Sequence, residues 1–140
     1  IVANMGKVFV GTELGGGGTS TPTTISIAET GIKNILAHFN IINEKPKTRE
    51  EMGLEPIKQM QMPDPKSFTF SKDTGIYEAL VDLDTPVKIG DTLGQIHFPE
   101  KPECIPVSYK AKIEGVLIGR VHKGLVCPGD FLALVAEEIK

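Results

Sequence analysis

The sequence predicts an α+β fold, in which a short α/β region is followed by an all-β region. An apolar run at residues 7–12 leads through a glycine-rich segment into a stretch with helical periodicity. From residue 68 onward, short apolar runs are separated by Gly, Pro and Asp, which is the pattern of strands and turns. The 140 residues include 15 Gly and 10 Pro. This excess favours turns and short strands over long helices.

The first region, residues 1–42, is predicted to contain a strand, a turn and a helix. The run Val8–Val10 within residues 7–12 predicts a buried strand, although no pairing partner is evident downstream. Thr21 is the candidate N-cap of the helix, with Pro22 at its first position. Gly31 predicts a kink or a break in this helix. The apolar residues with helical spacing are Ile25, Ala28, Ile32, Ile35, Leu36 and Phe39.

The second region, residues 43–67, is charged, rich in Pro and weakly apolar, and we predict a linker. It contains Met52, Met60 and Met62. Thioethers at irregular spacing are weak evidence for a soft-metal site. Contacts that fill gaps between other side chains are the better interpretation.

The third region, residues 68–140, is predicted to be all-β and to contain an internal repeat. Each copy reads Gly-apolar followed by Val-x-x-Gly-Asp-x-Leu, and the two Gly-Asp pairs are Gly90-Asp91 and Gly129-Asp130. Gly-Asp predicts a tight turn, because Gly accepts a positive φ and Asp bonds nearby backbone. Two such copies suggest two halves of a small closed β-structure, while two unrelated turns are the alternative. The expected strands are residues 68–70, 75–81, 92–98, 107–113, 115–121 and 131–135.

The repeat resembles the barrel-sandwich hybrid fold of biotinyl and lipoyl carrier domains. Those carriers present a modified lysine at a hairpin tip between the two halves. Here Lys101 lies between Glu100 and Pro102 and does not match the carrier motif. We therefore expect a barrel-sandwich-like domain without the carrier function.

The most informative segment is Thr12-Glu-Leu-Gly-Gly-Gly-Gly-Thr19. A glycine-rich turn between a strand and a helix can hold a phosphate. No Gly-Lys-Ser/Thr follows, however, and Glu13 would repel an anion. A carboxylate beside backbone that a ligand can approach closely is instead a candidate general base. The plain alternative is an exposed acid at a turn.

This segment and the helix after it resemble the succinylglutamate desuccinylase/aspartoacylase family and, within it, the branch of deacetylases that acts in ectoine breakdown. The family has a Glu-Leu-Gly-Gly-Gly-Gly-like motif and then a Gly-x-x-Asn-x-Leu helix, which Gly31, Asn34 and Leu36 match. Asn40 stands where the family often has Gly. The family also has a C-terminal β domain with Val-x-x-Gly-Asp turns, so the resemblance covers nearly the whole chain.

The resemblance implies a zinc-dependent amide hydrolase whose first domain has the carboxypeptidase-like α/β fold. It implies that Glu13 is the general base, which takes a proton from a zinc-bound water and passes one to the leaving amine. Zinc would polarise the carbonyl and lower the pKa of the water toward about 7. The substrate would be a small N-acyl amino acid, and the backbone of Gly15, Gly16 and Gly17 offers candidate substrate contacts.

The family binds zinc through His-x-x-Glu and a later His, all upstream of the Glu motif. The histidines here are His38, His97 and His122, and they do not supply this set. His97-Phe-Pro-Glu100 fits His-x-x-Glu literally, but it follows the base motif and contains Pro99, so a local turn is the better interpretation. Cys104 and Cys127 with the histidines would make an unusual zinc site, without clustered spacing. We therefore expect the zinc ligands outside this chain.

The sequence thus indicates the C-terminal part of a zinc hydrolase, inactive by itself. Ile1 in place of Met and the partnerless run at residues 8–10 favour a truncated or processed chain, with a leader removed by cloning as the alternative. The alternative function is a non-enzymatic binding or interaction module.

The formal charge of −3 argues against nucleic acid as a partner, and no apolar run is long enough to predict a membrane span. With two cysteines and no leader pattern, we expect a cytoplasmic protein. A homo-oligomer is a family-level expectation.

Overall fold

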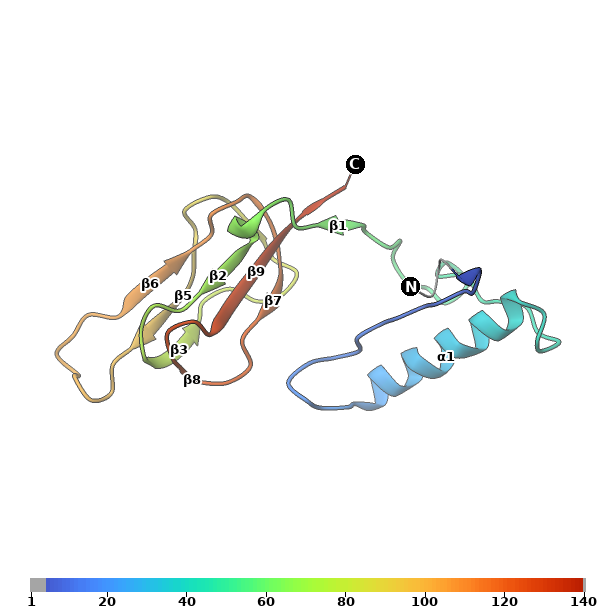
Figure 1. Ribbon diagram of the computed structural model, residues 1–140, viewed down its shortest axis with the longest axis horizontal. Coiled ribbons are helices and arrows are strands. Elements are labelled where there is room, and N and C mark those ends of the chain that lie inside the picture. Colours follow the sequence, from blue (N-terminus) through green and yellow to red (C-terminus); the bar gives the residue numbers. More distant parts are fainter. Residues whose placement is uncertain (1–4, 140) are drawn as a thin grey trace. The chain divides into compact units, whose positions relative to one another are not determined.

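The computed structural model describes residues 5–139, and its contacts divide the chain into two units, Ile1–Pro56 and Ile57–Lys140. The first unit contains a glycine-rich loop and one helix. The second unit contains all the strands of the described chain (Figure 1). The predicted order of an α-containing region followed by an all-β region is therefore confirmed. Among the described residues, no helix is both long and apolar enough to cross a membrane.

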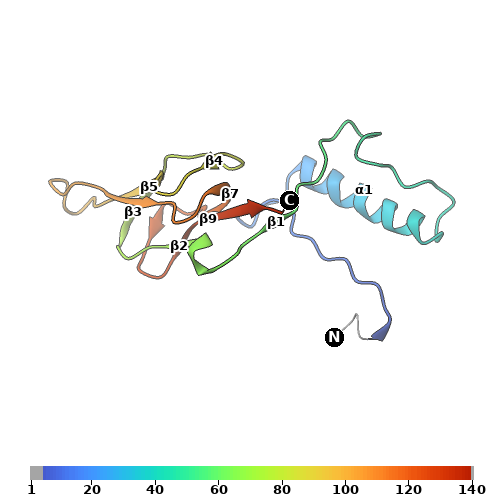
Figure 2. The same ribbon diagram turned by 90° about the horizontal axis from the view of Figure 1, so that it is seen from above.

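The helix of the first unit, α1, spans Pro22–His38. Its N-cap is Thr21, as predicted, and a reciprocal capping box with Thr24 binds two backbone N–H groups that the first turn would leave without partners. The helix continues through Gly31 without a break (Figure 2). The predicted break is wrong, because the cost of about 1 kcal/mol for one Gly in a helix is too small to end it.

The predicted strand at residues 7–12 is not formed. Val8, Phe9 and Val10 are 61–74% exposed and carry no strand assignment. A strand needs a hydrogen-bonding neighbour, and the first unit offers none among its described residues. The apolar run is therefore extended chain and not a buried strand.

The segment predicted as a linker is divided between the two units. Lys47 is held to α1, because its backbone N–H donates to Asn34 Oδ1 and its carbonyl accepts from Asn34 Nδ2, both at 2.9 Å. Further on, strand β1 (Met60–Gln61) pairs with the C-terminal strand of the second unit. A short 3₁₀ helix, Pro65–Ser67, then leads into the sheets.

The second unit consists of two antiparallel sheets. One has the order β6-β5-β3-β8, and the other has the order β1-β9-β7-β4, with β2 also paired to β9 (Figure 1). The strand bounds are β2 Phe68–Phe70, β3 Gly75–Ala79, β4 Pro86–Val87, β5 Thr92–His97, β6 Val107–Lys110, β7 Gly115–Arg120, β8 Leu125–Val126 and β9 Phe131–Glu138.

The predicted repeat is confirmed by hydrogen bonds that recur in both halves. Asp91 and Asp130 each accept a backbone N–H three residues back through Oδ2, from Lys88 at 2.8 Å and from Cys127 at 2.7 Å. The glycine before each Asp has a left-handed φ, 94° in Gly90 and 89° in Gly129. These are the tight turns predicted from the Gly-Asp pairs.

The strands of the two halves interleave. In the first half β3 pairs with β5, and in the second half β7 pairs with β9. Each half also pairs with the other, because β8 adds to β3 and β4 adds to β7. Each sheet therefore contains strands from both halves.

The core of the second unit lies between its sheets, because each apolar cluster joins residues from both. One buried cluster consists of Val87, Leu93, Ala111, Ile113, Leu117, Ala133 and Val135. The other consists of Tyr77, Ile96, Tyr109, Val126 and Leu132. The predicted closed β-structure is wrong in one respect, since no described strand pair joins the two sheets and their outer edges stay open.

Candidate functional site

The glycine-rich loop places Glu13 just before α1, on exposed backbone. Gly15, Gly17 and Gly18 have φ of 84°, 64° and 71°, a region that residues with a Cβ rarely adopt. The loop is closed by Thr19, whose hydroxyl and backbone N–H both donate to the Gly16 carbonyl, at 2.9 Å and 3.3 Å. The glycines therefore set the course of the chain beside the carboxylate.

The loop packs against the first turn of α1. A Cβ added at Gly15 would lie 3.2 Å from the Thr24 methyl group, which is tight contact. Glu13 itself has no hydrogen-bonded or ionic side-chain partner within residues 5–139. Its side chain is exposed.

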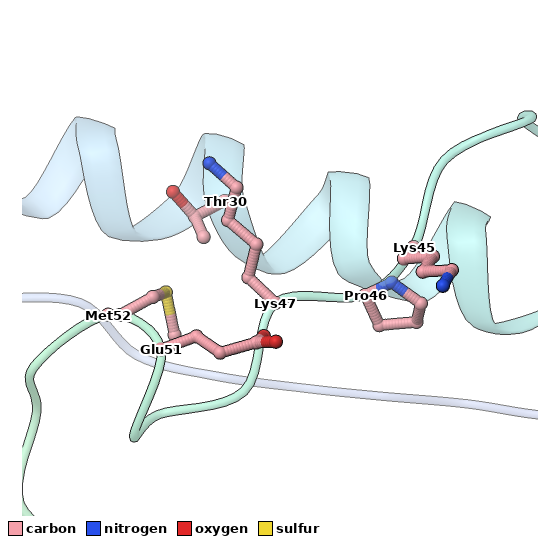
Figure 3. Close-up of a pocket in the computed structure, with 6 residues that line it drawn as sticks. All are labelled: Thr30, Lys45, Pro46, Lys47, Glu51 and Met52. Atoms are coloured by element: carbon pink, nitrogen blue, oxygen red, sulfur yellow. The ribbon is translucent and has the colours of Figure 1, made fainter.

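A pocket of about 680 Å³ lies along α1, lined by Thr30, Lys45, Pro46, Lys47, Glu51 and Met52 (Figure 3). The carboxylate of Glu51 is engaged, because it accepts the Thr48 backbone N–H at 2.8 Å. A neighbouring pocket of about 750 Å³ shares Thr30 and Met52 and adds Arg49. Sequence reasoning missed these pockets, since their charged residues stand in the segment interpreted as a linker.

The three histidines lie in different segments of the chain. His38 is the last residue of α1 and its ring packs edge-to-face on Phe39, with ring centroids 4.9 Å apart. His122 is exposed between β7 and β8. His97 ends β5, and the residues after it form the predicted turn, in which the Lys101 N–H donates to the Phe98 carbonyl at 2.9 Å.

Cys104 and Cys127 are exposed free thiols. In the described part of the chain, no three side chains of the His, Cys, Asp and Glu types come together in a way that could hold a metal ion.

One polar cluster was missed in the sequence and consists of Glu78, Gln95 and His97. His97 Nε2 lies 2.7 Å from Glu78 Oε2, and Gln95 Nε2 donates to the same oxygen at 2.6 Å. These contacts lower the pKa of Glu78, with the Gln95 hydrogen bond the larger cause and His97 the next. The alternation Gln95-x-His97 in a strand was the available signal, because it puts both side chains on one face.

Comparisons with known proteins find relatives that match almost the whole chain. The N-alpha-acetyl-L-2,4-diaminobutyric acid deacetylase of Halomonas elongata is 37% identical over 139 residues, which is 99% of this chain and 40% of that protein. The product-bound ectoine utilization protein EutE (DoeB) from Ruegeria pomeroyi has 37% identity and a TM-score of 0.86, covering 97% of this chain and 40% of that one. No family model matches the chain.

A third relative widens the comparison. The succinylglutamate desuccinylase/aspartoacylase of Rhodobacter sphaeroides has 29% identity and a TM-score of 0.87, over 99% of this chain and 42% of that one. The fold is therefore that of the C-terminal part of succinylglutamate desuccinylase/aspartoacylase proteins. More closely, the chain is a homologue of N-alpha-acetyl-L-2,4-diaminobutyric acid deacetylase, of which it spans 40% of the length. The resemblance inferred from the glycine motif is confirmed.

Proposed function

We propose that this chain is the base-bearing part of a hydrolase that removes an acyl group from an N-acylated amino acid. The observation that supports the proposal is the similarity to a deacetylase along 99% of the chain, which includes the Glu13 loop. The relatives carry the names of deacetylase and desuccinylase, so the shared chemistry is hydrolysis of an amide between an acyl group and an amino acid.

Glu13 is the residue to which we assign the general base. An amide carbonyl is a poor electrophile and an amine is a poor leaving group, so hydrolysis needs both a stronger nucleophile and a proton for the departing nitrogen. An exposed carboxylate without other partners serves both needs, because it accepts a proton from the attacking water and then delivers it to the amine. Gly15, Gly16 and Gly17 leave room for substrate close to the backbone, where N–H groups can donate to it.

The described residues do not fit the catalytic zinc site that the family resemblance implies, since no three side chains of the His, Cys, Asp and Glu types come together among them. A catalytic zinc site has three protein ligands and one open position. We therefore propose that the zinc ligands of the complete enzyme lie outside residues 5–139 and that the chain by itself has no deacylase activity. The cytoplasmic location and the homo-oligomer stay predictions.

The test is a chimera in which residues 1–140 replace the matching part of the Halomonas elongata deacetylase. We expect the chimera to hydrolyse N-acetyl-diaminobutyrate and to lose this activity on dialysis against a zinc chelator. Glu13→Gln should lower kcat by about 10²–10⁴-fold, the usual contribution of a positioned acid–base group.

Glu29→Gln, on the exposed side of α1, is the matched control and should leave kcat unchanged. A folded chimera whose activity survives Glu13→Gln would contradict the assignment of the base. A folded chimera without any activity would instead favour the alternative, a binding or interaction module. The chain alone, assayed in parallel, should show no turnover.

A further inference from the structure

The two copies of the repeat in the second unit can be compared position by position, and the comparison shows which polar side chains occur in one copy only. Strand β5 of the first half and strand β9 of the second half occupy equivalent places, because Ile76 pairs with His97 as Val116 pairs with Ala136. Leu134 is likewise the counterpart of Gln95 along these strands. The second half thus builds the same strand pairing with Ala136 and Leu134 where the first half has His97 and Gln95.

The third member of the cluster is also specific to the first half. Glu78 lies directly opposite Gln95 in regular register. The corresponding stretch of β7 contains a bulge between Leu117 and Gly119 and includes the apolar Ile118. The second half therefore forms the same strand pairing without this carboxylate, amide and imidazole, so the pairing does not require them.

The three side chains share one accessible face of the β6-β5-β3-β8 sheet. The side chains of His97 and Glu78 are 43% and 46% exposed, so a ligand reaches them without moving the core. Within residues 5–139, Glu78 has no ion pair with Lys or Arg. No Lys or Arg of the described residues therefore competes with a cation for this carboxylate.

We propose that Glu78, Gln95 and His97 form a binding site for a divalent transition-metal ion, with the imidazole Nε2 and the carboxylate as its two strong ligands. Imidazole and carboxylate together suit Zn²⁺ and Ni²⁺, whereas Mg²⁺ prefers oxygen ligands alone. Such ions bind imidazole nitrogen at about 2.0–2.1 Å and carboxylate oxygen at about 2.0–2.2 Å, so two neighbouring ligand atoms lie about 3.0 Å apart when they are at right angles and about 3.4 Å apart in a tetrahedral Zn²⁺ site.

The observed geometry is close to this requirement. His97 Nε2 and Glu78 Oε2 are 2.7 Å apart, so the two ligand atoms need to separate by about 0.3–0.7 Å. Gln95 lies 3.4 Å from the imidazole nitrogen and supplies an amide oxygen after rotation of its amide group. Water completes the coordination on the exposed side. Metal binding at this site does not depend on the proposed deacylase function.

The experiment is a titration of the full chain with Zn²⁺, Ni²⁺ and Mg²⁺ in turn, followed by calorimetry and by NMR of the imidazole signals. We expect one Zn²⁺ or Ni²⁺ per chain, a perturbation of the His97 imidazole, and no saturable binding of Mg²⁺. His97→Ala and Glu78→Gln should each weaken binding by more than tenfold, since loss of an outer-shell partner alone typically costs 10–100-fold. Gln95→Leu should have a smaller effect.

His122→Ala is the matched control, because His122 is an exposed histidine of the second half, and it should bind like the wild type. Glu13→Gln should also bind like the wild type, which separates this site from the catalytic proposal. His97→Ala introduces the residue that stands at the equivalent place in the second half, and His97→Asn is a second variant without the imidazole. The proposal is overturned if Zn²⁺ and Ni²⁺ do not saturate below about 1 mM, or if binding survives in the folded His97 and Glu78 variants.

Discussion

The two units of this chain bury their apolar residues to very different degrees. The second unit has two clusters of buried side chains between its sheets, in which Leu93, Leu117 and Leu132 are at most 1% exposed. In residues 5–56 the only buried residue is Ala37, while Phe9, Ile32 and Ile41 are 74%, 58% and 67% exposed. The second unit therefore has a core of its own, although Ile89 and Ile105 are 70% and 85% exposed, whereas the first unit leaves most of its large apolar side chains in contact with solvent.

The difference teaches how stability and function are distributed. The candidate base and the pockets along α1 lie in the unit that has little core of its own. The buried residues that stabilise the fold lie in the second unit, which does not contain the candidate base. Exposed apolar patches of this kind are typical of surfaces that contact other polypeptide.

The largest expected effect is a loss of stability on substitution in the second unit, compared with one substitution in the first unit. Leu117→Ala removes a side chain that is 1% exposed, and we expect the free energy of unfolding to fall by about 2–5 kcal/mol. Ile32→Ala removes a side chain that is 58% exposed and should change it by no more than about 0.5 kcal/mol. Urea denaturation followed by circular dichroism measures both. Equal losses would show that α1 is packed as tightly as the sheets.

A smaller effect is expected at two glycines. A Cβ at Gly75 would overlap the His97 carbonyl oxygen and the Ile96 side chain, so Gly75→Ala should destabilise the second unit by about 1–3 kcal/mol. A Cβ at Gly31 in α1 meets nothing within 4 Å, so Gly31→Ala should increase helix stability by about 1 kcal/mol. Thermal melts of the two variants provide the measurement. A neutral Gly75→Ala would mean that the close approach of β3 and β5 is not required.

The smallest effect concerns acid stability. The Lys123 hydrogen bond, and next the Cys127 backbone N–H, hold the pKa of Asp130 below its ordinary value of 3.8. Because the folded-state pKa is lowered, this stabilisation is present above pH 3.8 and is lost as the pH falls through the folded value. The difference in stability between the wild type and Asp130→Asn should therefore shrink below pH 3.8. Glu29→Gln on α1 serves as the control, and a difference that is constant with pH would exclude this role of the carboxylate.

Local signals predicted much of the second unit. The strand Phe68–Phe70 was predicted with its observed bounds, and the Gly-Asp turns were placed at Asp91 and Asp130 because a short sequence dictates the backbone there. The two-residue strands β1, β4 and β8 were missed, since two residues show no alternation. The closure of the predicted β-structure was wrong, because sheet closure depends on long-range pairing, which a repeat does not specify.

Site residues were predictable from the sequence only where they lie close together in one segment of the chain. Thr21 and the glycines around Glu13 follow from capping and turn chemistry, and the structure places them together before α1. The cluster of Glu78 with His97 depends on the register of β3 against β5, which brings residues far apart in the sequence within 2.7 Å. The alternation puts Gln95 and His97 on one face of β5, but it does not identify Glu78 as the residue of β3 that lies opposite them.

The pairing of β1 with β9 has a consequence for how the second unit can be joined to other chains. The Ile139 N–H donates to the Gln59 carbonyl at 2.8 Å, so the chain enters and leaves this unit at neighbouring points. A module of this shape can be inserted into a surface loop of a host protein without stretching the host backbone, because the loop ends are already held close together. The same closeness makes these two points suitable for joining by a short linker, with new ends opened in the loop between β5 and β6.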